Sequence, residues 1–338
     1  MHGFQMIQDI PLAVVTRAGW TENVHRGRYC VVAADDGKVV ASGGDIGALT
    51  FLRSTAKPLQ AIASLTGGVA SRFGWTDRHL ALMAASHRGH PEQIEALEQM
   101  LATSGVPEDA FAFRPSKPLD ASPREAWAKA GLAPRKICHT CAGKHTAMLA
   151  WSKMNGWPLT GYTEADHPAQ RVILRRVLDW TGASESECRI GRDGCGVPVA
   201  AVPLYNIALG YARLACPDVS PDREAAAAVS SVTAAMNRHP ELVEGPGRLA
   251  SLLLDDPNIV AKSGAQGLFA IGLRKERLGI AVHVSDGSEV AWPYIVMELL
   301  KRFGGVSDAT MRRLEARFPA AHRNDAGAPA GEWHVCLG

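Results

Sequence analysis

A serine and a lysine three residues apart, in the stretch FLRSTAKPLQAIA (51–63), are the first side chains whose types and spacing indicate chemistry. If this stretch is helical, Ser54 and Lys57 lie on one face, because residues i and i+3 are neighbours on a helix. A lysine kept neutral by burial or by a nearby cation can accept the serine proton and so activate a nucleophile. Backbone N–H groups at the start of the helix would then hold the developing oxyanion.

The plainer interpretation of Ser54 and Lys57 is structural. A chain of this length contains on the order of one S-x-x-K sequence by chance. Ser54 would then be a helix cap and Lys57 a solvated lysine, and the motif taken alone favours this interpretation. The surrounding sequence favours catalysis instead, because a predicted strand leads directly into the apolar helix that Ser54 opens.

Two further polar groups interrupt apolar runs. Ser86 and His87 end the run ALMAASH, and Lys262, Ser263 and Gly264 come just before a predicted strand. Burial would lower the pKa of Lys262, and the K-S-G triplet is similar to a motif of penicillin-binding enzymes. Taken singly, Ser86 and His87 are more typical of a helix C-terminus with a dipole-compensating histidine. An ordinary turn lysine is an equal alternative for Lys262.

The cysteine pattern is compatible with a zinc site. The C-x-x-C motif that ends at Cys141, together with Cys195 in RDGCGVP, could supply three ligands. The usual second pair is missing, however, and a fourth ligand is not evident, so a pair of reduced structural cysteines is the alternative. The neighbouring glycines Gly143, Gly194 and Gly196 instead predict a close approach of the backbone around a pocket.

The composition argues against several classes of protein. The chain has 338 residues and a formal net charge of +2, so nothing in it favours a nucleic acid partner. No apolar run reaches the length of a membrane span, and the first twenty residues lack the basic start and apolar centre of a signal peptide. We therefore expect a cytoplasmic protein without a membrane partner. Seven cysteines, an odd number, favour free thiols or metal ligands over disulfides.

The elements that must position these side chains are strands at both ends of the chain and helices between them. Two β-rich runs within 29–44 meet at Asp36-Gly37, which is a hairpin signal, and two more occupy 267–274 and 278–285. The segment 321–333, AHRNDAGAPAGEW, has the composition of a loop. The clearest helical patterns cover 76–86, 91–105, 144–156, 167–182 and 222–240.

This order of elements predicts an α+β fold. The terminal strands, at about 11–50 and 262–290, are expected in one antiparallel sheet, with a helical region at about 54–250 on and beside it. Residues 1–338 are predicted to form a single catalytic domain.

Seven stretches of the chain together resemble the Rhizobium etli-type L-asparaginases, which are class 3 of the asparaginase II family. They are ENVHRG, RSTAKPLQA, ASH, CAGKHTAML, DGCGVP, NRHPELVEGPGR and KSGAQGLFAIG, in this order within residues 11–304. Each stretch is weak by itself, and their joint order is highly specific. The resemblance implies a serine β-lactamase-like, penicillin-binding-protein-like fold, a homodimer, and hydrolysis of L-asparagine to L-aspartate and ammonia.

The resemblance also assigns roles to particular residues. It implies two Ser–Lys pairs, Ser54 with Lys57 and Ser86 with Lys262. It further implies a zinc ion held by a cysteine, a neutral lysine and a second cysteine, with water as a fourth ligand, and with a role in positioning substrate or stabilising local structure. The zinc ligands would be Cys141, Lys144 and Cys195, and the residues that bind the ends of the substrate would be Arg53, His87, Asp193 and His145.

In the mechanism that we expect, Lys57 accepts the proton of Ser54, and Ser54 attacks the side-chain amide carbon of asparagine. Ammonia leaves as the acyl-enzyme forms, and water then releases aspartate. Ser86 and Lys262 would relay protons to the leaving amine or activate the water. The sequence leaves open which serine is acylated, and the local spacing favours Ser54.

Three alternatives from other classes remain at this point. A penicillin-recognising hydrolase shares S-x-x-K and K-S-G, but it needs an S-x-N or Y-x-N motif that Tyr205-Asn206 and Ser186-Glu187 do not fit. A glutaminase or broader amidase would use the same chemistry on a different amide. A zinc-stabilised protein without enzymatic activity is the third alternative.

Overall fold

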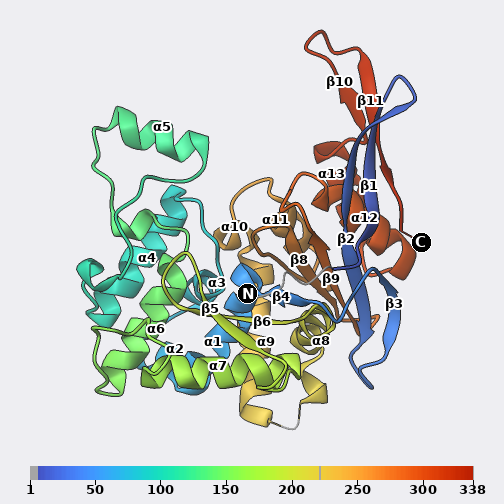
Figure 1. The fold of residues 1–338 in the computed structure, drawn as a ribbon. Helices are drawn as coiled ribbons and strands as arrows, with labels where there is room; N and C mark the ends of the chain where they lie inside the picture. Colours follow the sequence, from blue (N-terminus) through green and yellow to red (C-terminus); the bar gives the residue numbers. More distant parts are fainter. Residues whose placement is uncertain (1–6, 221, 338) are drawn as a thin grey trace, which may run out of the picture.

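The computed structural model describes residues 7–220 and 222–337, and a large antiparallel sheet organises them (Figure 1). The sheet has eight strands in the order β10-β11-β1-β2-β9-β8-β7, with β3 paired to β2. Its strands are β1 (Ile10–Arg17), β2 (Trp20–Ala33), β3 (Val39–Gly43), β7 (Ile259–Ser263), β8 (Leu268–Leu273), β9 (Leu278–Val284), β10 (Ala321–Arg323) and β11 (Pro329–Val335).

The two ends of the chain meet in the middle of this sheet. Gly27 to Ala33 of β2 pair with Val284 to Leu278 of β9, and this half of β2 is buried because strands or helices cover it. The predicted α+β class, with an antiparallel sheet built from N- and C-terminal strands and a helical block between them, is therefore confirmed. The hairpin predicted at Asp36-Gly37 is confirmed as the turn between β2 and β3.

The segment predicted as a loop at 321–333 is instead the hairpin β10–β11. Its turn is closed by Asn324, whose side chain accepts hydrogen bonds from the amides of Ala326 and Ala328. Trp333 is buried and stacks on Tyr294, with ring centroids 4.4 Å apart. The loop prediction was wrong because this segment is rich in small and turn-forming residues, which have low strand propensity. It forms a strand because β11 pairs with β1.

A second, three-stranded sheet has the order β4-β6-β5 and contains β4 (Leu49–Phe51), β5 (Arg189–Arg192) and β6 (Pro198–Pro203). The prediction that all strands up to about residue 50 share one sheet is therefore wrong for β4. This strand leads into the 3-10 turn η1 (Arg53–Ala56) and then into α1 (Lys57–Thr66). The strand that was expected to deliver Ser54 is present, and Ser54 lies in the 3-10 turn before the α-helix.

The helices lie mostly between the two sets of terminal strands in sequence, as predicted. Their bounds are α2 (Val69–Phe73), α3 (Asp77–Met83), α4 (Pro91–Ser104), α5 (Ala121–Lys129), α6 (Ala142–Met154), α7 (Pro168–Thr181), α8 (Leu204–Ala215), α9 (Arg223–Arg238), α10 (Pro240–Val243), α11 (Leu249–Leu254), α12 (Trp292–Phe303) and α13 (Asp308–Arg317), with 3-10 turns η2 (Glu108–Ala110), η3 (Lys136–Cys138) and η4 (Pro217–Val219).

Helix α1 packs against α6, α7 and α9, so the residues at its start are held inside the helical region. Helix α8 packs on β2, β8 and β9, while α12 packs on β1 and β11. The contact of α8 with the sheet is very close, because a Cβ added to Gly279 would lie 2.0 Å from the carbonyl oxygen of Ala208.

The buried apolar side chains form one continuous core that extends from the large sheet into the helical region. All seven cysteines have free thiols, and six of them are buried. In the part of the chain that the structure describes, no helix has both the length and the apolar character that crossing a bilayer requires.

Candidate active site

Lys57 is the buried centre of the site. Its side chain has no exposed surface, and its Nζ donates hydrogen bonds to Ser86 Oγ at 2.9 Å and to the carbonyl oxygens of Ala85 at 2.6 Å and Thr140 at 3.3 Å. Burial lowers the pKa of this lysine and outweighs the nearby charges, of which Cys141, Cys195 and Asp193 act to raise the pKa and Lys144 acts to lower it. A buried lysine with a lowered pKa and no carboxylate among its described hydrogen-bond partners can act as a base.

Ser54 lies beside this lysine in sequence and is partly exposed. Among residues 7–220 and 222–337, no side chain or backbone group is hydrogen-bonded to its hydroxyl, and in particular Lys57 is not. The preceding residue, Arg53, has a φ of 49°, in the left-handed region that a residue with a Cβ rarely adopts. Such strain persists only where the surroundings enforce it, and it is common at functional sites.

The two Ser–Lys pairs implied by the resemblance are arranged differently from expectation. Lys57 contacts Ser86, from the other pair, and Lys262 contacts Glu244 and Ser263. Within the described residues, neither the hydrogen bond between Ser54 and Lys57 nor one between Ser86 and Lys262 is present. The physical reason is the direction of the Lys57 side chain. It extends from the first turn of α1 to the segment that follows α3, where the Ala85 carbonyl oxygen and the Ser86 hydroxyl accept its hydrogen bonds.

A largely buried polar cluster lies next to Lys57. Its members are Arg53, Cys141, Lys144, Asp193 and Cys195. Arg53 Nε donates to Asp193 Oδ1 at 2.9 Å, and Lys144 Nζ lies 3.5 Å from Asp193 Oδ2. The same Asp193 oxygen accepts a hydrogen bond from Cys195 Sγ at 3.5 Å. Asp193 thus connects η1 to the turn between β5 and β6 and to the first turn of α6.

The two thiols of this cluster share a hydrogen bond, and they titrate differently because of it. The hydrogen bond from Cys195 lowers the pKa of Cys141 well below its ordinary value, and the charges of Lys57 and Lys144 lower it further. The same hydrogen bond and burial raise the pKa of Cys195. Burial opposes the charged form of Lys144, but the thiols and Asp193 outweigh it and raise its pKa.

The side chains of Cys141, Lys144 and Cys195 are compatible with zinc binding, although a lysine is an unusual zinc ligand. In the described part of the chain, no group of three histidine, cysteine or carboxylate side chains is arranged to hold a metal. The cluster nevertheless brings together two thiols and the amine of Lys144, which is hydrogen-bonded to Cys195. A thiol with a depressed pKa is a ready ligand, whereas Lys144 must lose a proton before its nitrogen can bind a metal.

Gly143 explains how α6 reaches this position. A Cβ at Gly143 would lie 2.0 Å from the carbonyl oxygen of Leu82, so α6 can approach the end of α3 only because this residue is glycine. The predicted close approach is confirmed here. It is wrong for Gly194, where a Cβ would meet nothing within 4 Å, and Gly196 owes its identity to a φ of 96°.

The two histidines expected to bind substrate are both fully buried. His87 Nε2 lies 2.7 Å from the carbonyl oxygen of His139, and burial lowers its pKa to about 3, so its ring is neutral. His145 Nδ1 lies 2.7 Å from the hydroxyl of Tyr162. Each ring keeps one nitrogen with no partner within the described residues, Nδ1 of His87 and Nε2 of His145.

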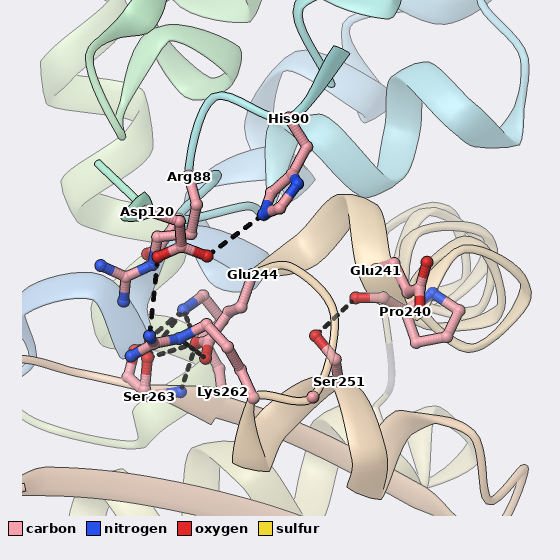
Figure 2. Close-up of polar contacts among 12 residues, drawn as sticks. Arg88, His90, Asp120, Pro240, Glu241, Glu244, Ser251, Lys262 and Ser263 are labelled. Carbon is pink, nitrogen blue, oxygen red and sulfur yellow. Dashed lines mark hydrogen bonds and ion pairs between the residues drawn. The ribbon is translucent and has the colours of Figure 1, made fainter. Parts of the chain in front are cut away.

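Lys262 belongs to a second buried network, shown in Figure 2. Its Nζ lies 2.5 Å from Glu244 Oε1 and 3.0 Å from the carbonyl oxygen of Ser263. Sequence reasoning missed Glu244, because a single glutamate in LVEGPG carries no spacing signal. A pocket of about 440 Å³ lined by Glu244, Ser263 and Arg248 opens beside this network. A larger cavity of about 970 Å³ lies over α7 and β5 and includes no residue of either network.

Comparison with known proteins gives one family and several weak structural similarities. The family model for L-asparaginase II matches residues 13–335. Among curated proteins, no sequence matches the chain. The chain is similar to a β-lactamase from Mycobacterium bovis, with 14% identity over 82% of this chain and 94% of that one, and a TM-score of 0.42. It is also similar to a Bacillus glutaminase, with 14% identity over 82% and 91% and a TM-score of 0.38.

Proposed function

The chain belongs to the L-asparaginase II family, and from that premise we propose that it hydrolyses the side-chain amide of L-asparagine through a serine that Lys57 activates. The observation that carries the proposal is the environment of Lys57. A lysine with no exposed surface, a lowered pKa and a serine hydroxyl at 2.9 Å is arranged to move protons between serines.

The reaction proceeds in two halves. Lys57 takes the proton of Ser54, whose Oγ forms a bond to the amide carbon as that carbon's oxygen becomes an oxyanion. The C–N bond then breaks, a proton passes to the leaving nitrogen, and ammonia departs from an ester of Ser54. Water, giving a proton to the same lysine, attacks the ester, the C–Oγ bond breaks, and aspartate leaves with Ser54 restored.

Access supports Ser54 over Ser86 as the nucleophile. Ser54 is partly exposed and its hydroxyl has no partner within the described residues, whereas Ser86 is only 6% exposed and already holds Lys57. Catalytic hydrogen bonds commonly tighten only when substrate is bound, so the missing contact between Ser54 and Lys57 is compatible with this assignment. Ser86 then serves as the proton relay between Lys57 and the leaving nitrogen.

The test is ammonia release from L-asparagine by the wild type and by Ser54→Ala, Ser86→Ala and Lys57→Met. Ser152→Ala is the matched control, because Ser152 is a fully buried serine whose hydroxyl, among the described residues, bonds to the Met148 carbonyl oxygen of its own helix alone. We expect Ser54→Ala and Lys57→Met to lose about 1,000-fold or more in kcat. If Ser86→Ala lost all asparaginase activity while Ser54→Ala kept high activity, Ser86 would be the nucleophile instead.

The same assay separates the other activities. L-glutamine run beside L-asparagine measures how far the site accepts the longer amide, and an acyl-enzyme seen by intact mass with penicillin would indicate a penicillin-recognising hydrolase. We infer that asparagine is preferred, with its charged ends held by Arg53 and Asp193 and by the neutral rings of His87 and His145. Anchoring both ends would distinguish asparagine from simple amides.

We further propose that Cys141, Lys144 and Cys195 bind zinc. The hydrogen-bonded thiols and the adjacent amine support this assignment. A zinc ion with three protein ligands would fix these side chains and Asp193, and through Asp193 the position of Arg53, so its contribution would be structural or positional. The Rhizobium etli type and the homodimer are proposals that the ordered motifs support, and light scattering of the purified protein tests the dimer. The cytoplasmic location stays a separate proposal.

A further inference from the structure

We propose that Glu244 is a positioning residue for Lys262, whose amine it holds in place beside the Ser–Lys site. This inference rests on the proposed function, because Lys262 matters to catalysis only if the Ser–Lys site hydrolyses an amide. The proposal concerns Glu244 itself, to which neither the sequence motifs nor the family match gives a role.

The geometry of Glu244 is that of a buried anchor. The glutamate is 2% exposed and Lys262 is fully buried. One carboxylate oxygen, Oε1, accepts hydrogen bonds from Lys262 Nζ at 2.5 Å, from the Ser263 amide at 3.2 Å and from the Ser263 hydroxyl. Three donors from two consecutive residues of β7 therefore converge on one oxygen, which fixes the lysine side chain relative to its own strand.

Glu244 also connects β7 to the segment that carries Ser86. The amide of Ser86 donates a 2.7 Å hydrogen bond to the carbonyl oxygen of Val243, the residue before Glu244. The turn that follows is fixed by Gly245, whose φ of 131° is disfavoured for other residues. The segment 243–245 is therefore bonded on one side to the relay serine and on the other to Lys262, and small shifts of Glu244 would move both.

The charged groups around the pair explain why Lys262 needs a carboxylate. Burial lowers the pKa of Lys262 to about 8, and the nearby charges of Lys57 and Arg88 act in the same direction, while Glu244 opposes them. Burial opposes ionisation of Glu244, but Lys262, Ser263 and Arg88 outweigh it and lower its pKa to about 2. Arg248 Nε lies 3.9 Å from the other carboxylate oxygen, Oε2, and Glu289 and the buried hydroxyl of Tyr211 also face this carboxylate. Both partners are therefore charged at neutral pH.

The two lysines of the site are thus prepared for opposite tasks. The hydrogen-bond partners of Lys57 are a hydroxyl and two carbonyl oxygens, and its neutral form can accept a proton. Lys262 is held by a carboxylate as an ammonium group, which can only donate. Environments that separate the protonation of two like groups are the usual way in which an enzyme provides an acid and a base together.

The direct test is a titration of the Lys262 amine that does not depend on turnover. The ¹³Cε resonance of Lys262, assigned with Lys262→Met in ¹³C-lysine-labelled protein, is followed against pH in the wild type and in Glu244→Gln. We expect its midpoint to fall by about 1–3 pH units in Glu244→Gln, because an opposite charge at contact distance is removed. An unchanged midpoint in folded Glu244→Gln would overturn the proposal.

The kinetic test uses a matched control. Glu241 lies three residues earlier, is exposed, and stands apart from the network in Figure 2, so Glu241→Gln removes the same charge without touching Lys262. We expect Glu244→Gln to lose about 100-fold in kcat with a small change in KM, and the high-pH limb of its kcat profile to move to lower pH. Glu241→Gln should keep the wild-type profile.

The conservative variant separates positioning from folding. Glu244→Asp keeps the charge with a shorter reach, so the Lys262 midpoint should stay near the wild-type value while kcat recovers only in part. If Glu244→Gln does not fold, full wild-type kcat in Glu244→Asp would overturn the positioning role. Absence of asparagine turnover in the wild type would count against the proposed function, whereas the titration would still decide the role of Glu244.

Discussion

Arg53 Nε donates a 2.9 Å hydrogen bond to Asp193 Oδ1, and this contact joins the turn that holds Ser54 to the turn that holds Cys195. The arginine is 31% exposed in its side chain, whereas the aspartate is only 8% exposed, so the pair extends from the buried cluster toward solvent. The hydrogen bond to Asp193 also helps to hold the backbone of Arg53 in its left-handed conformation. We propose that the same guanidinium also binds an anionic end of the substrate.

Arg53→Ala should therefore weaken the use of substrate more than the chemical step. We expect kcat/KM for asparagine to fall by about 10- to 100-fold, mainly through KM, because a charge-assisted hydrogen bond to the substrate is lost. Steady-state kinetics measure this. Arg192→Ala is the control, since Arg192 is exposed and pairs with Glu164 near the same turn. Equal losses in both variants would contradict the assignment.

Lys57→Met should abolish activity while the protein still folds. Methionine is similar in length to lysine, and the gain from removing a buried amine offsets part of the cost of leaving the oxygen atoms of Ala85, Ser86 and Thr140 without their donor. We expect a melting temperature within about 5 °C of the wild-type value, together with no measurable turnover. A melting temperature lowered by about 5 °C or more would show that Lys57 has a structural role beyond catalysis.

The free energy of unfolding should fall in acid because of Glu244. Its pKa is about 2 in the folded protein, below the ordinary 4.5, so its contribution is complete above pH 4.5 and is lost as the pH falls through 2. Lys262 is protonated in both states in this range and adds no slope. Between pH 5 and pH 3, protonation of Glu244 should cost about 2 kcal/mol of the free energy of unfolding. Urea unfolding at pH 5, 4 and 3 should show this loss in Glu241→Gln and not in Glu244→Gln. Identical slopes in the two variants would contradict this.

Removal of zinc should destabilise the protein while leaving some activity. We expect about one zinc per chain by elemental analysis, and a lower melting temperature after chelation, because the ion would tie α6 to the β5–β6 turn. Cys141→Ser should lose the metal, whereas Cys188→Ser, a change at another buried cysteine, should keep it. Complete loss of turnover on chelation, with the fold intact, would require a direct role for the metal in catalysis.

Gly143→Ala should be strongly destabilising. Its new methyl group would lie 2.0 Å from the Leu82 carbonyl oxygen, so α6 must move away from α3, at a cost of about 1–3 kcal/mol or more. Gly194→Ala is the matched control, because a Cβ there meets nothing within 4 Å. Thermal melting of both variants measures the difference. A wild-type melting temperature for Gly143→Ala would show that the two helices can separate freely.

Local patterns predicted the helices and the central strands well, because their hydrophobic periodicity is strong and does not depend on partners. The wrong predictions concern strands whose assignment depends on a partner strand. β11 is a strand because it pairs with β1, and β4 belongs to the small sheet because it pairs with β6. Neither partner is local in sequence, so composition alone favoured a loop for the first and the large sheet for the second.

The site shows the same division. Short motifs marked Lys57, Cys141 and Cys195 as candidates, and the roles expected of them came from the family resemblance rather than from spacing. The contact of Lys57 with Ser86 could not be inferred, because the direction of a long side chain depends on which oxygens lie around it. Glu244 lies in one of the stretches that carry the resemblance, but no role could be inferred for it, because its importance comes from three donors on β7 that are distant in sequence.

The pairing of β2 with β9 has a consequence for biosynthesis. Residues 27–33 leave the ribosome long before residues 278–284, at ordinary translation rates by roughly ten to fifty seconds. During that interval the most apolar half of β2 lacks its final neighbour and presents an unpaired edge. Nascent chains of this protein should therefore depend on chaperones in proportion to how slowly their middle section is translated.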